Sequence, residues 1–377
     1  MEAMWRRLLC MLVKEFLQML RDPRMRVVIF GTPVIQMTVM AFALTTDVNN
    51  IRMAVLDMDK TPASREFISA FTAGKYFRIS ATLTGQDEIT PILDRAEARA
   101  VLHIPARFSK DLYNGQTAKV QLLTDGTDSN STAIVQGYAG YILTDYNDRI
   151  QKKRLARKGI DPPVQIDTVS RAWYNPNQES HYYYVPSLIA TMLFIFSLLL
   201  TSIGIVREKE IGTIEQVMVT PIRRTEFILG KTIPYMITGY ISMTFMLIVA
   251  YLVFGVHVRG SLLLLYGLTG VYLAGNMGIA LIISGSAHTQ QQALLTSFLV
   301  LMPSVMLSGF LFPVTNMPES IRIATFGNPM RWYLEILRGI VMKDVGVTAL
   351  WPAILIQAGL TVTFLTVAVG RFKKTLK

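Results

Sequence analysis

The sequence predicts a mainly α-helical membrane protein, with six transmembrane helices and a large extracytoplasmic α/β domain between the first and second of them. Three observations support this fold class. The chain of 377 residues is 51% hydrophobic and only 17% charged. It contains six apolar runs of 18 to 24 residues that hold no Asp, Glu, Lys or Arg. Basic residues gather on one predicted side of these runs, and one long segment between the first two has the mixed composition of a folded aqueous domain.

Each apolar run is long enough to cross a bilayer as a helix. About 20 helical residues cross a hydrocarbon core of roughly 30 Å, and in lipid the backbone must satisfy its own hydrogen bonds. Six such runs are too many for the buried helices of a large soluble protein. Pro303 and Gly309 allow a break in the fifth run, where the chain could turn back. The runs are 27–44, 184–206, 232–255, 261–284, 293–312 and 350–370.

The basic residues predict the orientation of the chain. The segments 1–26, 207–231 and 371–377 together carry 15 Lys and Arg residues, whereas the short segments on the other side carry five. Such an excess marks the cytoplasmic side, so both termini are expected in the cytoplasm. The net charge of +11 is therefore interpreted as a topology signal, and nucleic acid is not expected as a partner.

Residues 1–26 precede the first membrane helix, which is predicted to extend over 27–46. The segment is apolar with interspersed charges, a pattern typical of a helix that lies on the inner membrane surface in contact with lipid. It contains Cys10, which is the single cysteine of the chain, so no disulfide is expected in the extracytoplasmic domain.

The extracytoplasmic domain is predicted over 47–183, where strand patterns alternate with helix patterns. This alternation indicates an α/β sheet domain, and the segment is long enough to have its own core. Aspartates follow the predicted strands, where they commonly bond to nearby backbone. We therefore interpret Asp57, Asp59, Asp125 and Asp128 as turn residues in preference to metal ligands. The expected strands are 51–56, 76–83, 98–104 and 118–124, and the expected helices are 64–71, 87–95, 106–113 and 131–158.

Residues 184–377 are predicted to hold the other five membrane helices, a charged cytoplasmic loop at 207–231 and an extracytoplasmic segment at 313–349. In the loop, Gly212 permits a sharp entry, Thr213 and Gln216 fit a capping box, and Pro221 ends the helix or begins the next. The sequence thus predicts a short amphipathic helix that forms a docking surface for another protein. A helix that lies on lipid is the alternative.

Several motifs resemble the ABC-2 type export permeases, which are the transmembrane subunits of ABC transporters. The 207–231 loop contains two of them, Arg207-Glu-Lys-Glu-Ile-Gly-Thr-Ile-Glu-Gln216 and Thr220-Pro221 followed by Leu229-Gly230-Lys231. The resemblance is strongest to the multidrug-efflux permeases of Gram-negative bacteria. Ile211 departs from the usual pattern of this motif. The other motifs are Lys14-Glu15-Phe16, Arg21-Asp22-Pro23, Met306 to Pro313, Met317-Pro318, and Asn328-Pro329 with Tyr333 and Arg338.

The resemblance implies a subunit of an ATP-driven exporter in the bacterial inner membrane. Its cargo would be a drug or another amphipathic or lipophilic small molecule. Two copies of a separate ABC ATPase subunit, which bind ATP and Mg, would dock on the 207–231 loop. A second permease copy would form a homodimer or a paralogous heterodimer. Some family members also cooperate with a periplasmic adaptor and an outer-membrane channel.

The resemblance also implies roles for particular residues. The expected contacts with the ATPase subunit are Arg207, Glu208, Gly212, Thr213, Glu215, Gln216 and Pro221. The expected extracytoplasmic re-entrant motif comprises Pro313, Asn328, Pro329, Tyr333 and Arg338. Polar and soft side chains within the apolar runs are candidates for the translocation path, namely Gln36, Asn276, Ser304 and Met306.

The chain is not expected to be an enzyme, to bind a cofactor or to hold a metal. Gly230-Lys231-Thr232 ends like a phosphate-binding loop, but Thr225 occupies the position of the first glycine, and no strand precedes it. Neither HExxH nor CxxC is present. Two alternatives remain, an ion-coupled antiporter and a membrane sensor. Against the antiporter, the runs lack intramembrane charges; against the sensor, only seven residues follow Gly370.

Two further packing patterns lie within the predicted helices. Gly270, Ala274 and Gly278 form a stripe of small residues, which is expected to pack against another helix of the same subunit. Arg331, Glu335 and Arg338 share one helix face and are expected to pair with one another.

Overall fold

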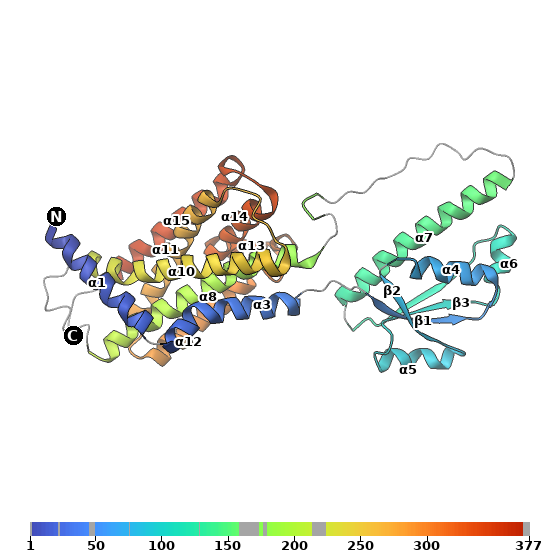
Figure 1. The fold of residues 1–377 in the computed structure, drawn as a ribbon, viewed down its shortest axis with the longest axis horizontal. Helices are drawn as coiled ribbons and strands as arrows, with labels where there is room; N and C mark the ends of the chain where they lie inside the picture. Colours follow the sequence, from blue (N-terminus) through green and yellow to red (C-terminus); the bar gives the residue numbers. More distant parts are fainter. Residues whose placement is uncertain are drawn as a thin grey trace. The chain divides into compact units, whose positions relative to one another are not determined.

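The computed structural model describes residues 2–21, 23–44, 50–74, 76–127, 129–157, 173–175, 179–212 and 224–371. They belong to two compact units, which are visible in Figure 1. The first unit is helical and comprises Met1–Thr45 and Ala172–Lys377, and the second comprises Thr46–Arg171.

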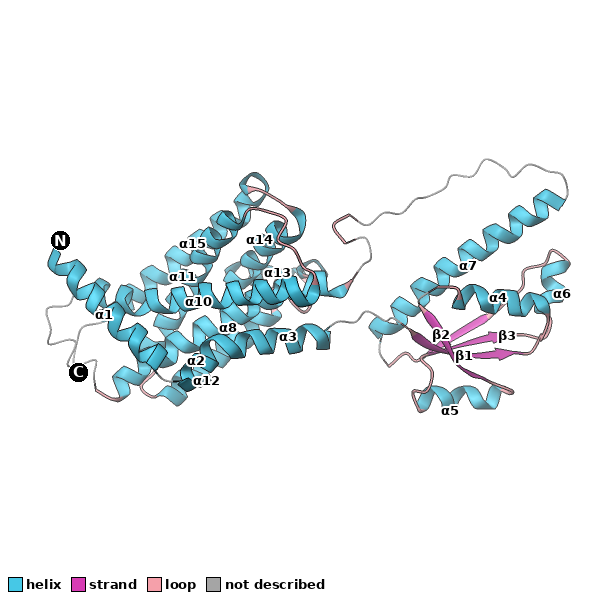
Figure 2. Ribbon diagram, in the orientation of Figure 1, coloured by secondary structure: helices cyan, strands magenta, loops and turns pink. Residues whose placement is uncertain are grey.

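The second unit is a four-stranded sheet with helices on both faces (Figure 2). The strand order is β2-β1-β3-β4, in which β1 is parallel to β2 and β3, and β4 is antiparallel to β3. The strands are β1 (Ile51–Asp57), β2 (Phe77–Thr82), β3 (Ala100–Ile104) and β4 (Gln121–Thr124). The main helices are α4 (Pro62–Thr72), α5 (Ile89–Asp94), α6 (Phe108–Tyr113) and α7 (Ser129–Arg157).

Apolar side chains from both faces of the sheet form the core of this unit. All five residues of β3 are buried, as its apolar sequence predicts. On one face, Phe67 and Phe71 of α4 pack against the strands together with α6 and α7. On the other face, Ile92 of α5 packs against Ala54 and Val101. The predicted strands and helices of this region are therefore observed, with ends that differ by a few residues.

The aspartates that follow the strands bond to nearby protein groups. Asp57 Oδ1 accepts hydrogen bonds from the backbone N–H groups of Asp59 and Lys60. Asp59 accepts from the backbone and the hydroxyl of Ser109, and Asp125 Oδ1 accepts from Thr127. The turn interpretation is confirmed for Asp57 and Asp125, whereas Asp59 connects its turn to the start of α6 through Ser109, and Asp128 lies outside the described residues.

The first unit is built from long helices with shorter ones between them. Within the part of the chain that the structure describes, five helical stretches are long and apolar enough to cross a membrane, and they are Val27–Leu44, Ser180–Glu210, Ile228–Phe254, Leu262–Ser286 and Val347–Arg371. The first stretch combines η1 (Val27–Gly31) and α3 (Thr32–Leu44), and it follows α1 (Glu2–Arg21) and α2 (Pro23–Arg26). The others lie in α8 (Ser180–Glu210), α10 (Arg224–Phe254), α11 (Leu262–Ser286) and α15 (Val347–Arg371).

The segment between α11 and α15 contains the break that Pro303 and Gly309 were expected to allow. The predicted run 293–312 is not one helix, because α12 (Gln290–Met306) has 17 residues and is followed by a turn. Pro303 has no N–H to continue the helical bonds, and Gly309 adopts a positive φ of 86° that favours glycine. After this turn come η3 (Val314–Asn316), α13 (Glu319–Ala324), η4 (Thr325–Gly327) and α14 (Pro329–Lys343).

Close helix packing holds the first unit together. A Cβ added at Gly278 of α11 would lie 2.9 Å from the backbone of Phe364 in α15, and one at Gly275 would lie 2.7 Å from the Thr361 hydroxyl. Because both residue numbers rise together along this contact, α11 and α15 run in the same direction. Gly270 faces Tyr240 of α10 in the same way. The prediction that the small-residue stripe packs within one subunit is confirmed.

Candidate functional site

A buried ion-pair cluster joins three helices at one end of the first unit. It consists of Lys14 and Glu15 of α1, Glu208 of α8 and Lys231 of α10. The ammonium nitrogen of Lys231 lies 2.8 Å from Oε1 of Glu15 and 2.7 Å from Oε1 of Glu208. The ammonium nitrogen of Lys14 lies 3.0 Å from the same oxygen of Glu208 and 3.7 Å from Oε1 of Glu15. Each carboxylate therefore contacts both ammonium groups.

Three of these four charges are withdrawn from solvent. The side chains of Lys231, Glu15 and Glu208 are only 2%, 3% and 8% exposed, whereas that of Lys14 is 50% exposed. Burial by itself lowers the pKa of Lys14, but its hydrogen bond to Glu208 and the two nearby carboxylates outweigh this and raise the pKa. A buried charge is costly unless it is paired, and this cluster balances two acids with two bases.

Helix α1 is held against α10 by one of its faces. Met11, Glu15 and Met19 are buried at four-residue spacing, which places them on the same side of the helix. A Cβ added at Gly230 would lie 2.6 Å from the sulfur of Met11, so the glycine lets α1 approach closely. The adjacent Lys231 then reaches Glu15. The motif Gly230-Lys231, which resembles the end of a phosphate-binding loop, serves here to dock one helix on another.

Another face of α1 is apolar and exposed. It carries Leu9, Val13 and Leu17, again at four-residue spacing and each more than half exposed. Exposed apolar residues in such a stripe are typical of a helix that rests in the interfacial layer of a membrane. The structure therefore gives the predicted surface helix both a docked face and an apolar face available to lipid.

The last turn of α8 contacts several other helices through consecutive side chains. Glu208 binds α1 and α10, as described above. Lys209 donates hydrogen bonds to the carbonyl oxygens of Ala287 at 3.0 Å and Gly285 at 3.5 Å, where α11 ends. Glu210 accepts from the backbone and side-chain nitrogens of Gln290, where α12 begins. Successive helical residues point about 100° apart, so each side chain reaches a different neighbour.

The chain leaves α8 immediately after this turn. Ile211 is 63% exposed, and Gly212 has a φ of 83°, which agrees with the sharp entry predicted for the 207–231 loop. Arg207 is also exposed. The other residues predicted to contact an ATPase subunit lie outside the described residues, and they are Thr213, Glu215, Gln216 and Pro221.

Glu208 was predicted to contact the ATPase subunit, but the structure places its carboxylate inside the cluster. The physical reason is the geometry of the turn, which aims Arg207 outward and Glu208 toward α10. Sequence reasoning missed Glu15 and Lys231 as partners of Glu208. Both carried a signal: Lys231 directly precedes an apolar run, and Glu15 interrupts an apolar helix.

The residues predicted to line a translocation path do not meet in one cavity. Gln36 is exposed on α3, and Met306 is exposed at the end of α12. Ser304 donates to the carbonyl of Val300 within its own helix. Asn276 is fully buried in α11 and donates to the hydroxyl of Ser197 in α8 at 3.2 Å.

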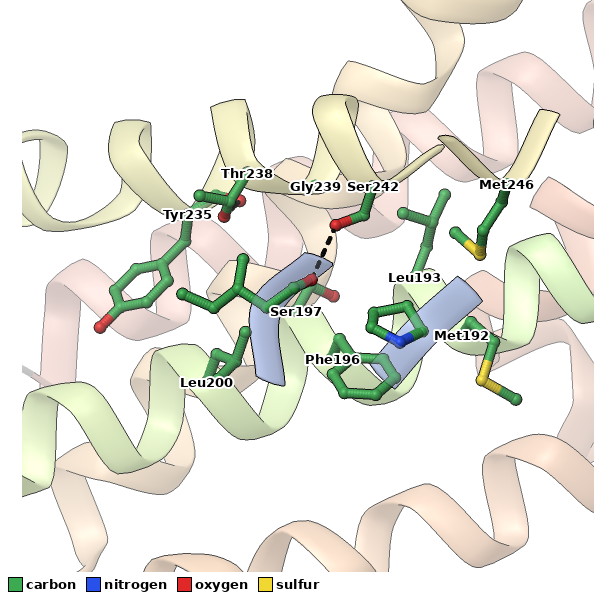
Figure 3. A pocket seen from close by; sticks show the side chains of 12 residues that line it. Met192, Leu193, Phe196, Ser197, Leu200, Tyr235, Thr238, Gly239, Ser242 and Met246 are labelled. Carbon is green, nitrogen blue, oxygen red and sulfur yellow. Dashed lines mark hydrogen bonds between the residues drawn. The ribbon is translucent and has the colours of Figure 1, made fainter. Parts of the chain in front are cut away.

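A small cavity lies between η1, α3, α8 and α10 (Figure 3). Its free volume is about 20 Å³, which is room for one water molecule. The hydroxyl of Ser242 lies on its wall and donates to the carbonyl of Ile29 at 3.1 Å. Apart from a few such polar groups the lining is apolar and includes Met192, Phe196 and Met246. In this conformation the cavity is too small for a drug-sized molecule.

The predicted re-entrant motif is divided: Asn328, Pro329, Tyr333 and Arg338 lie at the cap of α14 or within it, whereas Pro313 lies before η3. The side chain of Asn328 caps this helix by accepting from the N–H of Met330, and it also donates to the carbonyl of Ser304 in α12. Pro329 occupies the first helical turn, where its missing N–H costs nothing. Pro313 is exposed and precedes η3. Ten of the fifteen residues of α14 are buried, so the helix packs within the bundle.

Two residues of α14 bind it to neighbouring helices. The ring of Tyr333 stacks on Tyr272 of α11 at 4.0 Å, and its hydroxyl hydrogen-bonds with that of Thr269. Arg338 donates two hydrogen bonds to the hydroxyl of Ser187 in α8, at 2.7 and 3.0 Å. The guanidinium group also lies 3.9 Å from the ring centre of Tyr183.

The predicted pairing of Glu335 with Arg331 and Arg338 is wrong. Among the described residues no ion pair joins Glu335 to either arginine. Arg331 instead lies over the ring of Phe326 and bonds to Thr325. Burial lowers the pKa of Arg338, and the nearby Tyr183 opposes this effect, but an arginine remains protonated at neutral pH. Both guanidinium groups find partners outside their own helix face, which leaves Glu335 exposed.

Comparisons with known proteins agree with these motifs. The family described as ABC-2 family transporter protein matches residues 23–369. The probable multidrug ABC transporter permease YbhR of Escherichia coli is 33% identical over 359 residues, covering 94% of this chain and 96% of the relative. The probable permease YbhS of the same organism is 31% identical over 344 residues, covering 90% and 89%. The inner membrane transport permease YhhJ is 25% identical over 366 residues, covering 97% and 96%.

Proposed function

Since the chain belongs to the ABC-2 family of transporter proteins, we propose that it is the permease subunit of an ATP-driven exporter of amphipathic or lipophilic small molecules, energised by a separate ATP-binding subunit. By its family it is a membrane protein, a permease subunit of an ABC-2 multidrug-type transporter. Members of this family act with ABC ATPase subunits and usually dimerise. The specific cargo class, the docking site and the orientation are our proposals.

The organisation of the α8 end is the observation that carries the proposal. A subunit driven by an external ATPase needs a surface that the ATPase can push and a connection from that surface to the membrane helices. Exposed Ile211 and then Gly212, with its positive φ, lead the chain out of α8 within the 207–231 loop. The three residues before them contact α1, α10, α11 and α12. A force applied to this loop therefore acts on several helices at once.

We propose six crossings of the membrane, with both termini in the cytoplasm and the 46–171 unit outside. Five helical stretches among the described residues have the required length and apolarity. Since α11 and α15 run in the same direction, the chain between them must return across the bundle. Helix α12 makes this return, and its 17 residues cover about 26 Å at 1.5 Å per residue. The turn that follows α12 would complete the crossing.

The separate ATP-binding subunit would bind ATP and Mg. Two copies of it would associate with a dimer of the permease. In this chain, Lys231 is engaged by two carboxylates. The lysine of the sequence that resembles a phosphate-binding loop therefore pairs with Glu15 and Glu208 and does not point to a phosphate site. This arrangement supports an external source of energy.

An ion-coupled antiporter is less well supported. Such a transporter needs a titratable group within the membrane that ions can reach. Among the described residues, the buried Glu and Lys side chains are Glu15, Glu208, Glu226 and Lys231. All four lie in α1, near the end of α8 or near the start of α10, so they gather at one end of the bundle.

The docking proposal is tested by the recovery of the ATP-binding subunit. Glu215→Arg reverses a charge in the 207–231 loop and should greatly reduce co-purification of a co-expressed ATP-binding subunit. Glu319→Arg is the matched control, since it makes the same change in the segment proposed to lie on the opposite side, where Glu319 is exposed. Equal recovery with both variants would remove the docking claim, provided that both insert normally into the membrane.

A further inference from the structure

We propose that Lys231 is a positioning residue that links the 207–231 loop to α1, so that nucleotide-driven movement of the loop displaces α1 along the inner membrane surface. This inference rests on the proposed function, because it assumes that an ATP-binding subunit moves the loop. It adds a moving part, α1, and the ion pairs that move it.

The first step of the argument is that both ends of the loop are fastened to the same place. Glu208 lies four residues before Gly212, at the end of α8, and Lys231 lies in the second turn of α10. Their side chains meet at 2.7 Å. Both also contact α1, through Lys14 and Glu15. A displacement of the loop therefore reaches α1 from two sides.

The second step is that the ion pairs between α1 and the ends of the loop can exchange partners. Breaking a single buried pair would leave an unpaired charge, which is strongly unfavourable. Here Lys14 already contacts both carboxylates, at 3.0 and 3.7 Å, and half of its side chain is exposed. When Lys231 moves away from one carboxylate, Lys14 can close on it. The cluster can thus change its pairing without leaving a buried carboxylate alone.

The third step is that the face of α1 opposite its contact with α10 packs against no described helix. Among the side chains of α1 that the structure describes, Met11, Glu15 and Met19 are buried on the docked face, while Leu9 and Val13 are exposed. Lipid chains that contact these exposed residues do not fix the helix in one register. The ion pairs are then the directional contacts that decide where α1 lies relative to α10, because the apolar contacts have no preferred direction.

The native sequence provides a label for the test. Cys10 is the single cysteine of the chain and is exposed on α1. A second label can be placed by Ser286→Cys, at the exposed last residue of α11. Pulsed electron spin resonance would measure the distance between the two labels. The sample would be the full chain in lipid nanodiscs with its ATP-binding subunit, with and without a non-hydrolysable ATP analogue.

The expected result is a nucleotide-dependent shift in the distance for the otherwise native chain. Lys231→Met should abolish this shift, while Lys231→Arg, which keeps the charge and can reach both carboxylates, should restore it. A purely structural role would lower stability in Lys231→Met but leave the shift in the molecules that remain folded. If Lys231→Met proves poorly folded, Lys231→Met with Glu15→Gln keeps the cluster neutral and should also lack the shift.

The outcomes separate this inference from the proposed function. If the ATP-binding subunit does not associate with the native chain, the proposed function fails. If it associates and hydrolyses ATP but the native distance does not change, the displacement of α1 is refuted and the proposed function stands. A full shift in either neutralised variant would refute the role of Lys231.

Discussion

The ammonium group of Lys231 lies 2.7 Å from the carboxylate of Glu208, and neither side chain is more than 8% exposed. The two residues border the 207–231 loop from opposite ends. Their contact closes the loop at its base, and Glu15 adds a second carboxylate 2.8 Å from the same ammonium group. In the proposed exporter this arrangement fastens the docking loop to the membrane helices and to α1.

Removal of the Lys231 charge should destabilise the protein more than removal of a balanced pair. Lys231→Met leaves Glu15 and Glu208 with only Lys14, and the loss of one partner of a buried pair typically costs about 3–5 kcal/mol. Lys231→Met combined with Glu208→Gln leaves Lys14 and Glu15, which balance. The double variant should therefore be less destabilised than the sum of the two single changes.

Thermal unfolding of the four proteins in one detergent measures this coupling. The control is Lys153→Met with Glu66→Gln, because that ion pair is exposed on the second unit and should contribute at most about 1 kcal/mol. Strict additivity at the Lys231–Glu208 pair would show that the buried cluster does not act as a unit.

Gly230→Ala should weaken the attachment of α1. The added methyl group would lie 2.6 Å from the sulfur of Met11, and such overpacking commonly costs about 1–3 kcal/mol. Met11→Ala in the same chain should recover part of this loss, because it removes the obstructing atoms. The measurement is protease cleavage after Arg21 or within α1, which should become faster in Gly230→Ala alone. Unchanged cleavage in that variant would contradict the close contact.

The docking of α1 should be insensitive to pH through the neutral and mildly alkaline range. The pKa of Lys14 is raised above its ordinary value of 10.5. A group whose pKa is higher in the folded state contributes its full stabilisation below the unfolded value, and the contribution is lost as pH rises through the folded value. The mobility of a spin label on Cys10 should therefore stay constant from about pH 7 to about pH 9.5. Lys14→Met should show a mobility that is higher throughout. A change in label mobility near neutral pH in the native chain would contradict the conclusion that the ion pairs of Lys14 persist through this range.

The sequence predicted the elements of this fold better than their contacts. Patterns of apolar residues located the membrane helices, and alternating strands and helices located the sheet, because both depend on local periodicity. A break in the fifth run was expected from Pro303 and Gly309, but its position after Met306 was not, since a charge-free run does not show at which residue the helix ends. The ion-pair cluster was missed for a different reason. Its members on α1 (Lys14 and Glu15), α8 (Glu208) and α10 (Lys231) meet only through tertiary packing.

The same distinction explains the errors at α14. The spacing of Arg331, Glu335 and Arg338 predicted pairing along one helix, and that pattern is local. The guanidinium of Arg338 instead reaches Ser187 of α8, a contact that no local pattern encodes. The proposed path residues lie apart, because a polar group in an apolar run can bond to a neighbouring helix, as the amide nitrogen of Asn276 does to Ser197.

Gly278→Ala should separate α11 from α15. The new methyl group would lie 2.9 Å from the backbone of Phe364, which cannot move aside as a flexible side chain could. We expect a loss of about 1–3 kcal/mol. Gly267→Ala is the matched control on the same helix, because no atom lies within 4 Å of its added methyl group. The melting temperature of Gly278→Ala should be lower than that of the native chain. That of Gly267→Ala should be equal to it or higher, since alanine favours helix more than glycine does. Equal effects of the two changes would contradict the packing.

Arg338→Lys should destabilise the protein almost as much as Arg338→Gln, although it keeps the positive charge. The guanidinium donates twice to Ser187 and once to the carbonyl of Gly309, and it lies over the ring of Tyr183. A lysine ammonium cannot reproduce this forked geometry. Each hydrogen bond from a charged group contributes about 1.5–3 kcal/mol, so the melting temperature in detergent should fall by several degrees in both variants. Ser187→Ala should cause a smaller loss by itself and add little to Arg338→Lys, because the two changes remove the same contact. If Arg338→Lys has the melting temperature of the native chain, the positive charge alone matters at this position. The contacts of α14 with α8 and with the turn after α12 would then not depend on the shape of the guanidinium group.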